Sequence, residues 1–404
     1  MSTPVNDWAT DYDIFDPQYI ADPFGIWDEL RQTCPMAHTD RWGGSWLPTR
    51  YADVYAIAHD TEKFPSGNGI SVVPVPADSG GLAEGQRPLL TSGIPPISAD
   101  APLHTWTRRL VLPTMSPARV AEYEVYTRAL CRRLVDDILA RGEGDAAAEY
   151  AQQIPVRVIG HILGVPEEMS STFTEWVRDI LEFANDAERR MRGITGLVAY
   201  VQEAIADRQA NPKDDFITEL LQSEHDGEPT GVDVVMGMCA LLLIAGIDTT
   251  WSSIGSTMWH LATHPDDRRR LVAEPDLMPT AIEEFLRAYA PVTMARRLIE
   301  DTEYNGCPIK AGERILMNFP GANRDPEVFP DANTVILDRE HNRHLAFGSG
   351  IHRCAGSNLA RMELRVAVEE WLARIPEFAV TDPAKVTWAG GQVRGPRTVP
   401  VRVA

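Results

Sequence analysis

Cys354 is the side chain in this sequence whose surroundings best suit chemistry. The segment over residues 347–356 reads FGSGIHRCAG, and a helical pattern follows directly from Ser357 to Ile375. A sulfur between a glycine-bent loop and a helix N-terminus faces free backbone N–H groups and the positive end of the helix dipole. Both features stabilise the thiolate relative to the thiol. The segment therefore predicts a thiolate that binds a metal ion.

The other cysteines and a zinc ion offer alternative interpretations. The remaining four cysteines are interpreted as small buried apolar side chains: Cys34, Cys131, Cys239 and Cys307. Zinc is a candidate metal because three histidines lie near Cys354 in the sequence: His341, His344 and His352. Zinc sites, however, commonly pair their ligands as C-x2-4-C or H-x3-5-H, and this segment offers one sulfur only. The pattern favours a metal bound through a single thiolate.

The glycines and the phenylalanine around Cys354 share a rationale. Gly350 and Gly356 are expected to let the backbone approach a flat ligand closely, and Phe347 to shield the sulfur from water. The spacing F-x-x-G-x-x-x-C-x-G resembles the haem-binding loop of the cytochrome P-450 superfamily. That resemblance implies that haem b (iron protoporphyrin IX) is the cofactor and that the Cys354 thiolate is the proximal iron ligand.

A second chemically suggestive segment, AGIDTT, covers residues 245–250 within a predicted helix. A glycine inside a helix costs about 1 kcal/mol relative to alanine, so Gly246, beside Ala245, suggests space for a cofactor face. The segment resembles the oxygen-activation motif of the same superfamily, A/G-G-x-D/E-T. The resemblance implies that Thr249 hydrogen-bonds dioxygen and that Asp248 relays protons from solvent. Thr249 is also expected to bond back to a carbonyl and open the helix.

Glu284 and Arg287 stand three residues apart and therefore share one face of a helix. Most such pairs are surface salt bridges that contribute little to stability. Here they resemble the E-x-x-R element of the superfamily, which a later arginine completes, and Arg339 fits that position. The resemblance implies a structural role in which the three side chains hold the region of the cysteine loop in place.

Haem carries two propionate groups, which require cationic partners. The resemblance assigns four side chains to them: His104, Arg108, Arg296 and His352. Arg109 and Arg297 are immediate neighbours of two of these residues. A shift by one position is therefore an open alternative.

The substrate pocket is predicted by likeness to relatives. The segment from Phe64 to Pro102 is rich in glycine, proline and serine and is too long for a simple connection, which indicates a functional loop. The resemblance adds five pocket residues: Leu242, Val292, Thr293, Met294 and Val393. These side chains are mainly apolar, which favours a neutral or weakly polar organic substrate of small or medium size.

Hydrophobic periodicity predicts a mainly α protein with small β-sheets. The expected helices are Tyr19–Thr33, Tyr51–His59, a series between His104 and Gln209, Asp233–His264, Pro279–Ala290 and Ser357–Ile375. The expected strands are an edge strand at Trp46–Pro48, short strands between Val292 and Asn318, and a terminal strand at Val399–Val403. The resemblance implies the cytochrome P-450 fold, a single domain over residues 1–404, with haem between the helix that carries Gly246 and the helix after Cys354.

Composition limits the partners of the chain. The formal net charge is -20, from 58 acidic and 38 basic residues, which disfavours binding to nucleic acid or to anionic membranes. The N-terminus is polar and acidic and lacks the pattern of a secretory signal. The longest uncharged apolar run, Val234–Ile247, is 14 residues long, shorter than the roughly 20 that cross a bilayer. With an odd number of scattered cysteines, these features predict a cytoplasmic protein that does not enter a membrane.

The resemblance as a whole implies a haem-thiolate monooxygenase of the soluble, bacterial, three-component type. Such an enzyme inserts one oxygen atom from O2 into its substrate, by hydroxylation or O-dealkylation. It takes electrons from a ferredoxin or flavodoxin-type protein that an NAD(P)H reductase reduces. A patch of arginines on the thiolate side is expected to dock that donor: Arg108, Arg109, Arg132, Arg133, Arg353, Arg361 and Arg365.

Two alternative functions share the cysteine ligand. A peroxide-driven haem peroxygenase has less need of an acid–alcohol pair, so the presence of Asp248 and Thr249 counts against it. A non-catalytic haem sensor would bind a gas or ligand without coupled oxidation of a product. The sequence favours the monooxygenase.

Overall fold

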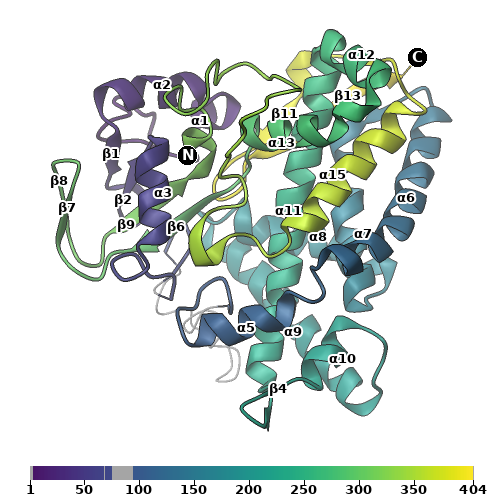
Figure 1. Cartoon of the computed structure of the whole chain (residues 1–404), viewed down its shortest axis with the longest axis horizontal. Helices are drawn as coiled ribbons and strands as arrows, with labels where there is room; N and C mark the ends of the chain where they lie inside the picture. Colours follow the sequence, from purple (N-terminus) through teal and green to yellow (C-terminus); the bar gives the residue numbers. More distant parts are fainter. Residues whose placement is uncertain (1–2, 68, 75–93, 404) are drawn as a thin grey trace.

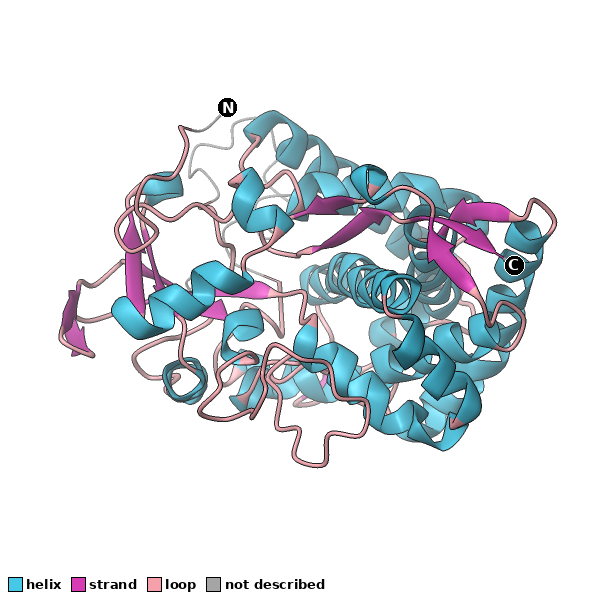
Figure 2. Ribbon diagram, turned by 90° about the horizontal axis from the view of Figure 1, so that it is seen from above, coloured by secondary structure: helices cyan, strands magenta, loops and turns pink. Residues whose placement is uncertain are grey.

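A computed structural model describes residues 3–67, 69–74 and 94–403. Helices make up most of the molecule, and its strands gather into small sheets (Figure 2). The largest sheet lies at one end of the molecule and the long helices lie at the other (Figure 1). The predicted fold class, mainly α with small β-sheets, is confirmed.

The helices and strands have the following bounds. The helices are α1 (Pro17–Ala21), α2 (Phe24–Thr33), α3 (Tyr51–His59), α5 (Leu103–Val111), α6 (Pro117–Leu139), α7 (Gln153–Leu163), α8 (Ser170–Leu181), α9 (Ala187–Ala210), α10 (Phe216–Leu221), α11 (Val232–Thr263), α12 (Pro265–Ala273), α13 (Met278–Ala288), α14 (Phe319–Ala322) and α15 (Ser357–Leu372). The strands are β1 (Met36–Thr39), β2 (Ser45–Pro48), β3 (Glu143–Asp145), β4 (Glu224–His225), β5 (Glu228–Pro229), β6 (Thr293–Arg297), β7 (Thr302–Tyr304), β8 (Cys307–Ile309), β9 (Arg314–Asn318), β10 (Phe378–Val380), β11 (Thr387–Ala389), β12 (Gly395–Thr398) and β13 (Pro400–Val403).

Helix α11 is the centre of the helical part. Its apolar residues surround the helix rather than forming one stripe, so nearly the whole circumference must be buried. Helices α7, α8, α9 and α15 and strand β12 pack around it, and Val235, Leu243 and Ile254 are fully enclosed. By length and composition alone, α11 also qualifies as a membrane-spanning helix. Its packing is that of the core helix which the sequence predicts.

The four-stranded sheet has the order β1-β2-β9-β6. Strands β2 and β9 are parallel, whereas β1 and β2, and β6 and β9, are antiparallel. The strand predicted at Trp46–Pro48 is confirmed as β2, but it lies between two partners and not at the edge of the sheet. Pro48 is tolerated because it is the last residue of β2, opposite Met36. At the end of the strand, the missing N–H of proline does not interrupt the hydrogen bonds between β1 and β2.

The predicted helix Tyr19–Thr33 is in fact two helices, α1 and α2. Asp22 adopts an extended conformation, with φ -152° and ψ 94°, directly before Pro23. A proline ring disfavours the helical region for the residue that precedes it, so the helix ends there. The remaining predicted helices lie within a few residues of their expected ends.

The tail of the chain brings β12 against α11 through two glycines. A Cβ atom at Gly395 would lie 2.3 Å from the Cβ of Ser252, and a Cβ at Gly255 would lie 3.0 Å from Cγ of Pro396. Gly395 therefore needs to be glycine for the close approach of strand and helix, and a side chain at Gly255 would require Pro396 to shift. As a consequence, Arg397, which follows Pro396 in β12, is buried beside α11.

We predict that Gly395→Ala destabilises the protein by about 1–3 kcal/mol, because the added methyl group overlaps Ser252 in a packed contact. Urea unfolding followed by circular dichroism measures this change. Gly25→Ala in α2 is the control, since a Cβ there meets no heavy atom within 4 Å. That helical substitution is expected to stabilise by about 0.5–1 kcal/mol. Unchanged stability of Gly395→Ala would contradict the close strand–helix contact.

Candidate active site around Cys354

The loop before α15 holds Cys354 through its backbone. The Cys354 N–H donates to the carbonyl oxygen of Phe347 at 2.8 Å, and α15 begins three residues after the cysteine. Gly350 has a φ of 71°, and a Cβ there would lie 2.6 Å from the carbonyl oxygen of Ala58. Glycine is therefore needed for packing against α3. Gly350 itself is not among the residues that line the cavity at Cys354, whereas its neighbours Gly348 and Ser349 are.

Two opposing effects act on the pKa of Cys354. Burial raises the pKa of the Cys354 thiol above its ordinary range. The Gly356 N–H and nearby arginines, Arg108 first, lower the pKa without outweighing burial. Coordination to a metal ion deprotonates a thiol ligand outright, so the thiolate form depends on the metal.

A cavity of about 1720 Å³, counted with its open mouth, lies between the cysteine loop and α11. Its wall includes nine of the predicted cofactor, metal and catalytic residues, among them Ala245, Gly246, Thr249, Phe347, Cys354 and Gly356. Of these six, the first three belong to α11, and the last three belong to the loop that leads into α15. The two segments that the sequence analysis places on either side of a cofactor therefore share one cavity.

Several cationic or donor groups at this cavity have no anionic partner in the described chain. Arg296 is buried, and its guanidinium donates to the carbonyl oxygen of Ala295. His104 and His352 each bury an Nε2 atom without a hydrogen-bond partner among the described residues, and their ring centres lie 4.4 Å apart. Burial and the charge of Arg296 lower the pKa of His352 to about 3. Buried polar groups require partners, so this cluster fits a ligand with carboxylate oxygens, such as the propionates of haem.

The structure distinguishes between the neighbouring arginines. Arg108 and Arg296 line the cavity. Arg109 is exposed, and the exposed Arg297 donates from Nε to a backbone carbonyl at 2.9 Å. The positions assigned first, Arg108 and Arg296, are therefore the two that face the cavity.

Most predicted pocket residues also face the cavity. Four of the five line it: Leu242, Val292, Met294 and Val393. Thr293 does not line it, because successive side chains of a strand point to opposite faces and Thr293 is buried on the other face of β6. The predicted loop Phe64–Pro102 contributes four apolar residues to the wall: Ile70, Ile94, Pro96 and Ile97. Its residues 75–93 lie outside the described part of the chain.

The cavity also contains apolar residues that the sequence analysis missed, among them Ile159 of α7 and Leu181 at the end of α8. Ile159 gives a second reason for Gly246, since a Cβ at Gly246 would lie 2.6 Å from Cδ1 of Ile159. Gly246 is thus required by the contact between α7 and α11 as well as by the cavity. The periodicity of α7 and α8 indicates burial, but it does not indicate burial against a cavity.

Thr249 adopts the expected hydrogen bond but not the expected distortion. Its Oγ1 donates to the carbonyl oxygen of Ala245 at 2.7 Å. Helix α11 nevertheless stays α-helical from Val232 to Thr263, so the predicted opening of the helix does not occur. The carbonyl accepts the hydroxyl in addition to its helical N–H, which leaves the backbone ladder intact.

Asp248 is fully buried and has no contact with solvent. Its Oδ1 lies 2.9 Å from Nη2 of Arg397, and Ser252 donates to the same oxygen at 3.4 Å. Burial raises the pKa of Asp248, whereas the charge of Arg397 lowers it. The Asp248 carboxylate is therefore held by Arg397 behind the cavity wall. No motif marks Arg397, because it is 149 residues away in the chain.

The structure brings Glu284, Arg287 and Arg339 together. Arg287 donates two hydrogen bonds of 2.8 Å to the Glu284 carboxylate, and Arg339 donates one of 3.0 Å. Arg287 also donates to the carbonyl oxygens of Asn323 and Ala332. Glu284 and Arg287 are fully buried. The cluster thus ties α13 to the irregular segment that leads to the cysteine loop.

The predicted arginine patch is largely neutralised. Four of its seven members pair with glutamates: Arg132, Arg133, Arg361 and Arg365. Arg108 faces the cavity. Arg109 and Arg353 are exposed, and within the described ranges no carboxylate pairs with either of them. The positive charge available to a partner is therefore smaller than the sequence indicates.

The histidines considered for zinc are not grouped around Cys354. His344 Nε2 lies 3.1 Å from a carboxylate oxygen of Glu283. In the part of the chain that the structure describes, no three His, Cys, Asp or Glu side chains are arranged to hold a metal ion.

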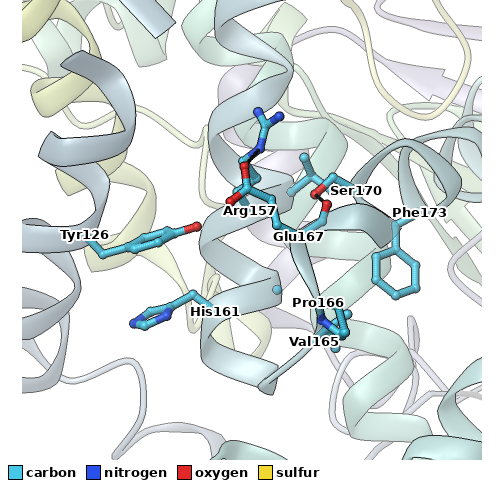
Figure 3. A pocket seen from close by; sticks show the side chains of 10 residues that line it. Tyr126, Arg157, His161, Val165, Pro166, Glu167, Ser170 and Phe173 are labelled. Atoms are coloured by element: carbon cyan, nitrogen blue, oxygen red, sulfur yellow. Dashed lines mark hydrogen bonds and ion pairs between the residues drawn. The ribbon is translucent and has the colours of Figure 1, made fainter. Parts of the chain in front are cut away.

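A smaller hollow of about 360 Å³ lies away from Cys354, between α6, α7 and α8 (Figure 3). Arg157 Nε pairs with Glu167 at 2.7 Å on one side, and the rings of Tyr126 and His161 stack at 4.3 Å on the other. It contains no residue of the predicted site.

The cavity has the donor set of a haem-thiolate protein, and comparisons with known proteins agree. The sequence model of the family described as Cytochrome P450 matches residues 167–375. A mycinamicin IV hydroxylase/epoxidase of Micromonospora griseorubida is 34% identical over 387 residues, which cover 93% of this chain and 94% of that protein. A vitamin D(3) 25-hydroxylase of Pseudonocardia autotrophica is 33% identical, with 91% and 90% covered. The solved structure of a cytochrome P450 from Chondromyces apiculatus superimposes with a TM-score of 0.86 at 30% identity, covering 98% of this chain and 99% of that one.

The chain therefore belongs to the cytochrome P450 family. It is a monooxygenase, hence an oxidoreductase, whose cofactor is haem b. The family, the P450 fold and the cofactor that the cysteine motif predicts are thereby confirmed.

We predict that Glu284→Gln lowers the free energy of unfolding by about 3–5 kcal/mol, because it leaves the buried guanidinium of Arg287 without its anion. Chemical denaturation measures this loss. Glu274→Gln is the control, since it removes one partner of an exposed pair with Arg270 and is expected to have little effect. Equal stabilities of the two variants would show that the buried cluster does not anchor this region.

Proposed function

We propose that this protein hydroxylates or O-dealkylates a small or medium, mainly apolar organic molecule, with electrons from a ferredoxin or flavodoxin-type protein. The observation that supports this proposal best is the apolar cavity that Cys354 and Thr249 share. In each turnover one atom of O2 enters the substrate. The other atom leaves as water, which requires two electrons and two protons.

The residues for holding haem are those gathered at the cavity. Cys354 would be the iron ligand, and four side chains would contact the propionates: His104, Arg108, Arg296 and His352. When bound, haem supplies the activation and cleavage of dioxygen. Phe347, in the cavity wall beside the sulfur, would keep water away from it.

The residues for controlling protons are Thr249 and Asp248 on α11. The Thr249 hydroxyl lies in the cavity wall and is held by the carbonyl oxygen of Ala245, so it can turn toward a ligand in the cavity. Asp248, the preceding residue, is an acid buried behind that wall. The pair would deliver protons while apolar neighbours limit access of bulk water.

The substrate class follows from the lining. Apolar side chains from five regions surround the space beyond Thr249: Ile70, Ile97, Leu181, Leu242, Val292 and Val393. An apolar wall with few polar groups binds through burial of hydrocarbon surface. The names of relatives, a vitamin D(3) 25-hydroxylase and a mycinamicin IV hydroxylase/epoxidase, are consistent with organic substrates that contain much apolar surface.

The electron donor would dock where the cysteine loop reaches the surface. Arg109 and Arg353 are exposed there beside two exposed apolar side chains, Leu112 and Ile351. The segments are joined, since Arg108 donates to the carbonyl oxygen of Arg353. A small apolar patch with positive charge favours an acidic donor protein, and charge attraction would speed the encounter. We place the reaction in the cytoplasm, where such donors are kept reduced.

The first prediction concerns the iron ligand. In Cys354→Ala, the reduced, carbon-monoxide-treated protein is expected to lack the red-shifted Soret band of a thiolate complex. Cys307→Ser, which changes a half-buried cysteine of β8, is expected to retain that band. Absorbance spectra of the two variants measure the difference. An unaltered band in Cys354→Ala would refute the assignment of the ligand.

The second prediction concerns the reaction. Compounds that convert the haem from low to high spin are expected to yield a product with one labelled oxygen when turnover uses labelled O2 and an electron donor. Mass spectrometry measures the label. Turnover with peroxide alone and no dependence on the donor would favour the peroxygenase, whereas binding without any oxidised product would favour the sensor.

The third prediction concerns the donor. Arg109→Glu combined with Arg353→Glu is expected to slow reduction by a ferredoxin at least about tenfold at low ionic strength, with the difference shrinking as salt is added. Stopped-flow absorbance measures the rate. Arg269→Glu combined with Arg270→Glu on α12, which changes the charge by the same amount far from the cysteine loop, is the control (Figure 1). Equal rates in all variants would contradict docking at this surface.

A further inference from the structure

The end of α8 connects the cavity to a buried ion network. Leu181, the last residue of α8, lines the cavity, and the next residue, Glu182, does not. The Glu182 carboxylate accepts hydrogen bonds from Arg178 at 2.8 and 3.0 Å and from Arg397 at 3.0 Å. A ligand that displaces Leu181 must therefore also displace a carboxylate that is bound to Arg397.

Arg397 is held by two elements at once. Its Nε donates to Glu182, while Nη2 lies 2.9 Å from Oδ1 of Asp248 and Nη1 donates to Ser252 at 3.2 Å. Its guanidinium also lies 4.1 Å from the ring centre of Trp251. The Arg397 guanidinium thus pairs with two carboxylates, that of Glu182 at the end of α8 and that of Asp248 on α11.

The backbone of β12 prevents Arg397 from leaving this position easily. The contacts of Gly395 with Ser252 and of Pro396 with Gly255 fix the strand on α11. Arg397 itself is buried. The other charged groups that act on Asp248 are Arg178 and Glu182, which are both on the α8 side and pair with each other. Arg397 is consequently the cation on which Asp248 depends.

We propose that Arg397 is a positioning residue that couples the cavity wall at the end of α8 to the Asp248 carboxylate. Glu182 and Asp248 share the guanidinium of Arg397. Because the two carboxylates repel each other, each weakens the ion pair between the other and Arg397. A ligand that moves the end of α8 therefore changes the strength of the ion pair between Arg397 and Asp248. By reciprocity, a change at Asp248 alters the stability of the end of α8. This inference rests on the proton-transfer role proposed for Asp248.

The reciprocal effect gives a test that needs no substrate and no turnover. In haem-loaded Asp248→Asn, the neutral side chain no longer competes for Arg397, so Arg397 binds Glu182 more tightly. Hydrogen–deuterium exchange at the end of α8 is then expected to slow by about threefold. The reporting amides are those of Glu182 and Phe183, which donate to the carbonyl oxygen of Arg178. A purely structural loss of an ion pair would instead leave this exchange unchanged or speed it.

The coupling must also disappear when Arg397 is absent. Adding Asp248→Asn to an Arg397→Gln background is expected to leave exchange at the end of α8 unchanged. Arg394→Gln is the matched control in the same tail, because Arg394 donates to the backbone carbonyls of Ile20 and Ala21 and not to Asp248. In that background, Asp248→Asn is still expected to slow exchange.

Two results would overturn the proposal. One is faster or unchanged exchange in the single variant Asp248→Asn; the other is slower exchange that persists without Arg397. If Arg397→Gln does not fold, Glu182→Gln replaces it, and Asp248→Asn must then have no effect on the end of α8. Because the measurement does not involve oxidation, its failure would leave the proposed monooxygenase reaction untouched.

Discussion

A charge that is removed from water needs a partner, and this requirement organises the region around Cys354. The fully buried Glu284 and Arg287 satisfy each other and add Arg339, so α13 is locked to the segment before the cysteine loop. This contact restricts the position of the cysteine loop relative to α15. An isolated pair on one helix would not achieve this, because it would hold neither the irregular segment nor the loop.

The same requirement explains why the cavity suits haem. Arg296 is buried without a carboxylate, and the nearby histidines keep unpartnered nitrogens within the described structure. Such a cluster is unfavourable unless an anion completes it, which the propionates of haem would do. The raised pKa of the Cys354 thiol follows the same logic, because the sulfur needs a metal ion before its charge is tolerated. Protein and haem are thus electrostatically complementary. The iron would stabilise the charge on the sulfur, and the propionates would pair with the cationic side chains.

Close backbone packing is the second organising constraint. Gly246 accommodates Ile159 of α7, and Gly395 accommodates Ser252 of α11, so both glycines allow elements to approach more closely than any side chain would permit. One contact shapes the cavity wall beside Thr249. The other carries Arg397 into the interior, where it joins Asp248 to the end of α8. The surroundings of Asp248 and Thr249, to which we assign proton transfer as a proposal, are therefore set by packing of α7, α8 and β12 as well as by the motif on α11.

The sequence by itself determined the family and the fold class and located the cysteine loop and the Asp248–Thr249 segment of α11, because these motifs depend on residues at fixed, short spacings. The choice between Arg296 and Arg297 depended on which face of β6 meets the cavity, and the exclusion of Thr293 depended on the same alternation. The neutralisation of the arginine patch depended on glutamates supplied by other helices. Arg397 stayed hidden because its partners are far away in the chain and come together only when β12 docks on α11. Local spacing can specify a motif, but which buried charges share a partner is decided by tertiary packing.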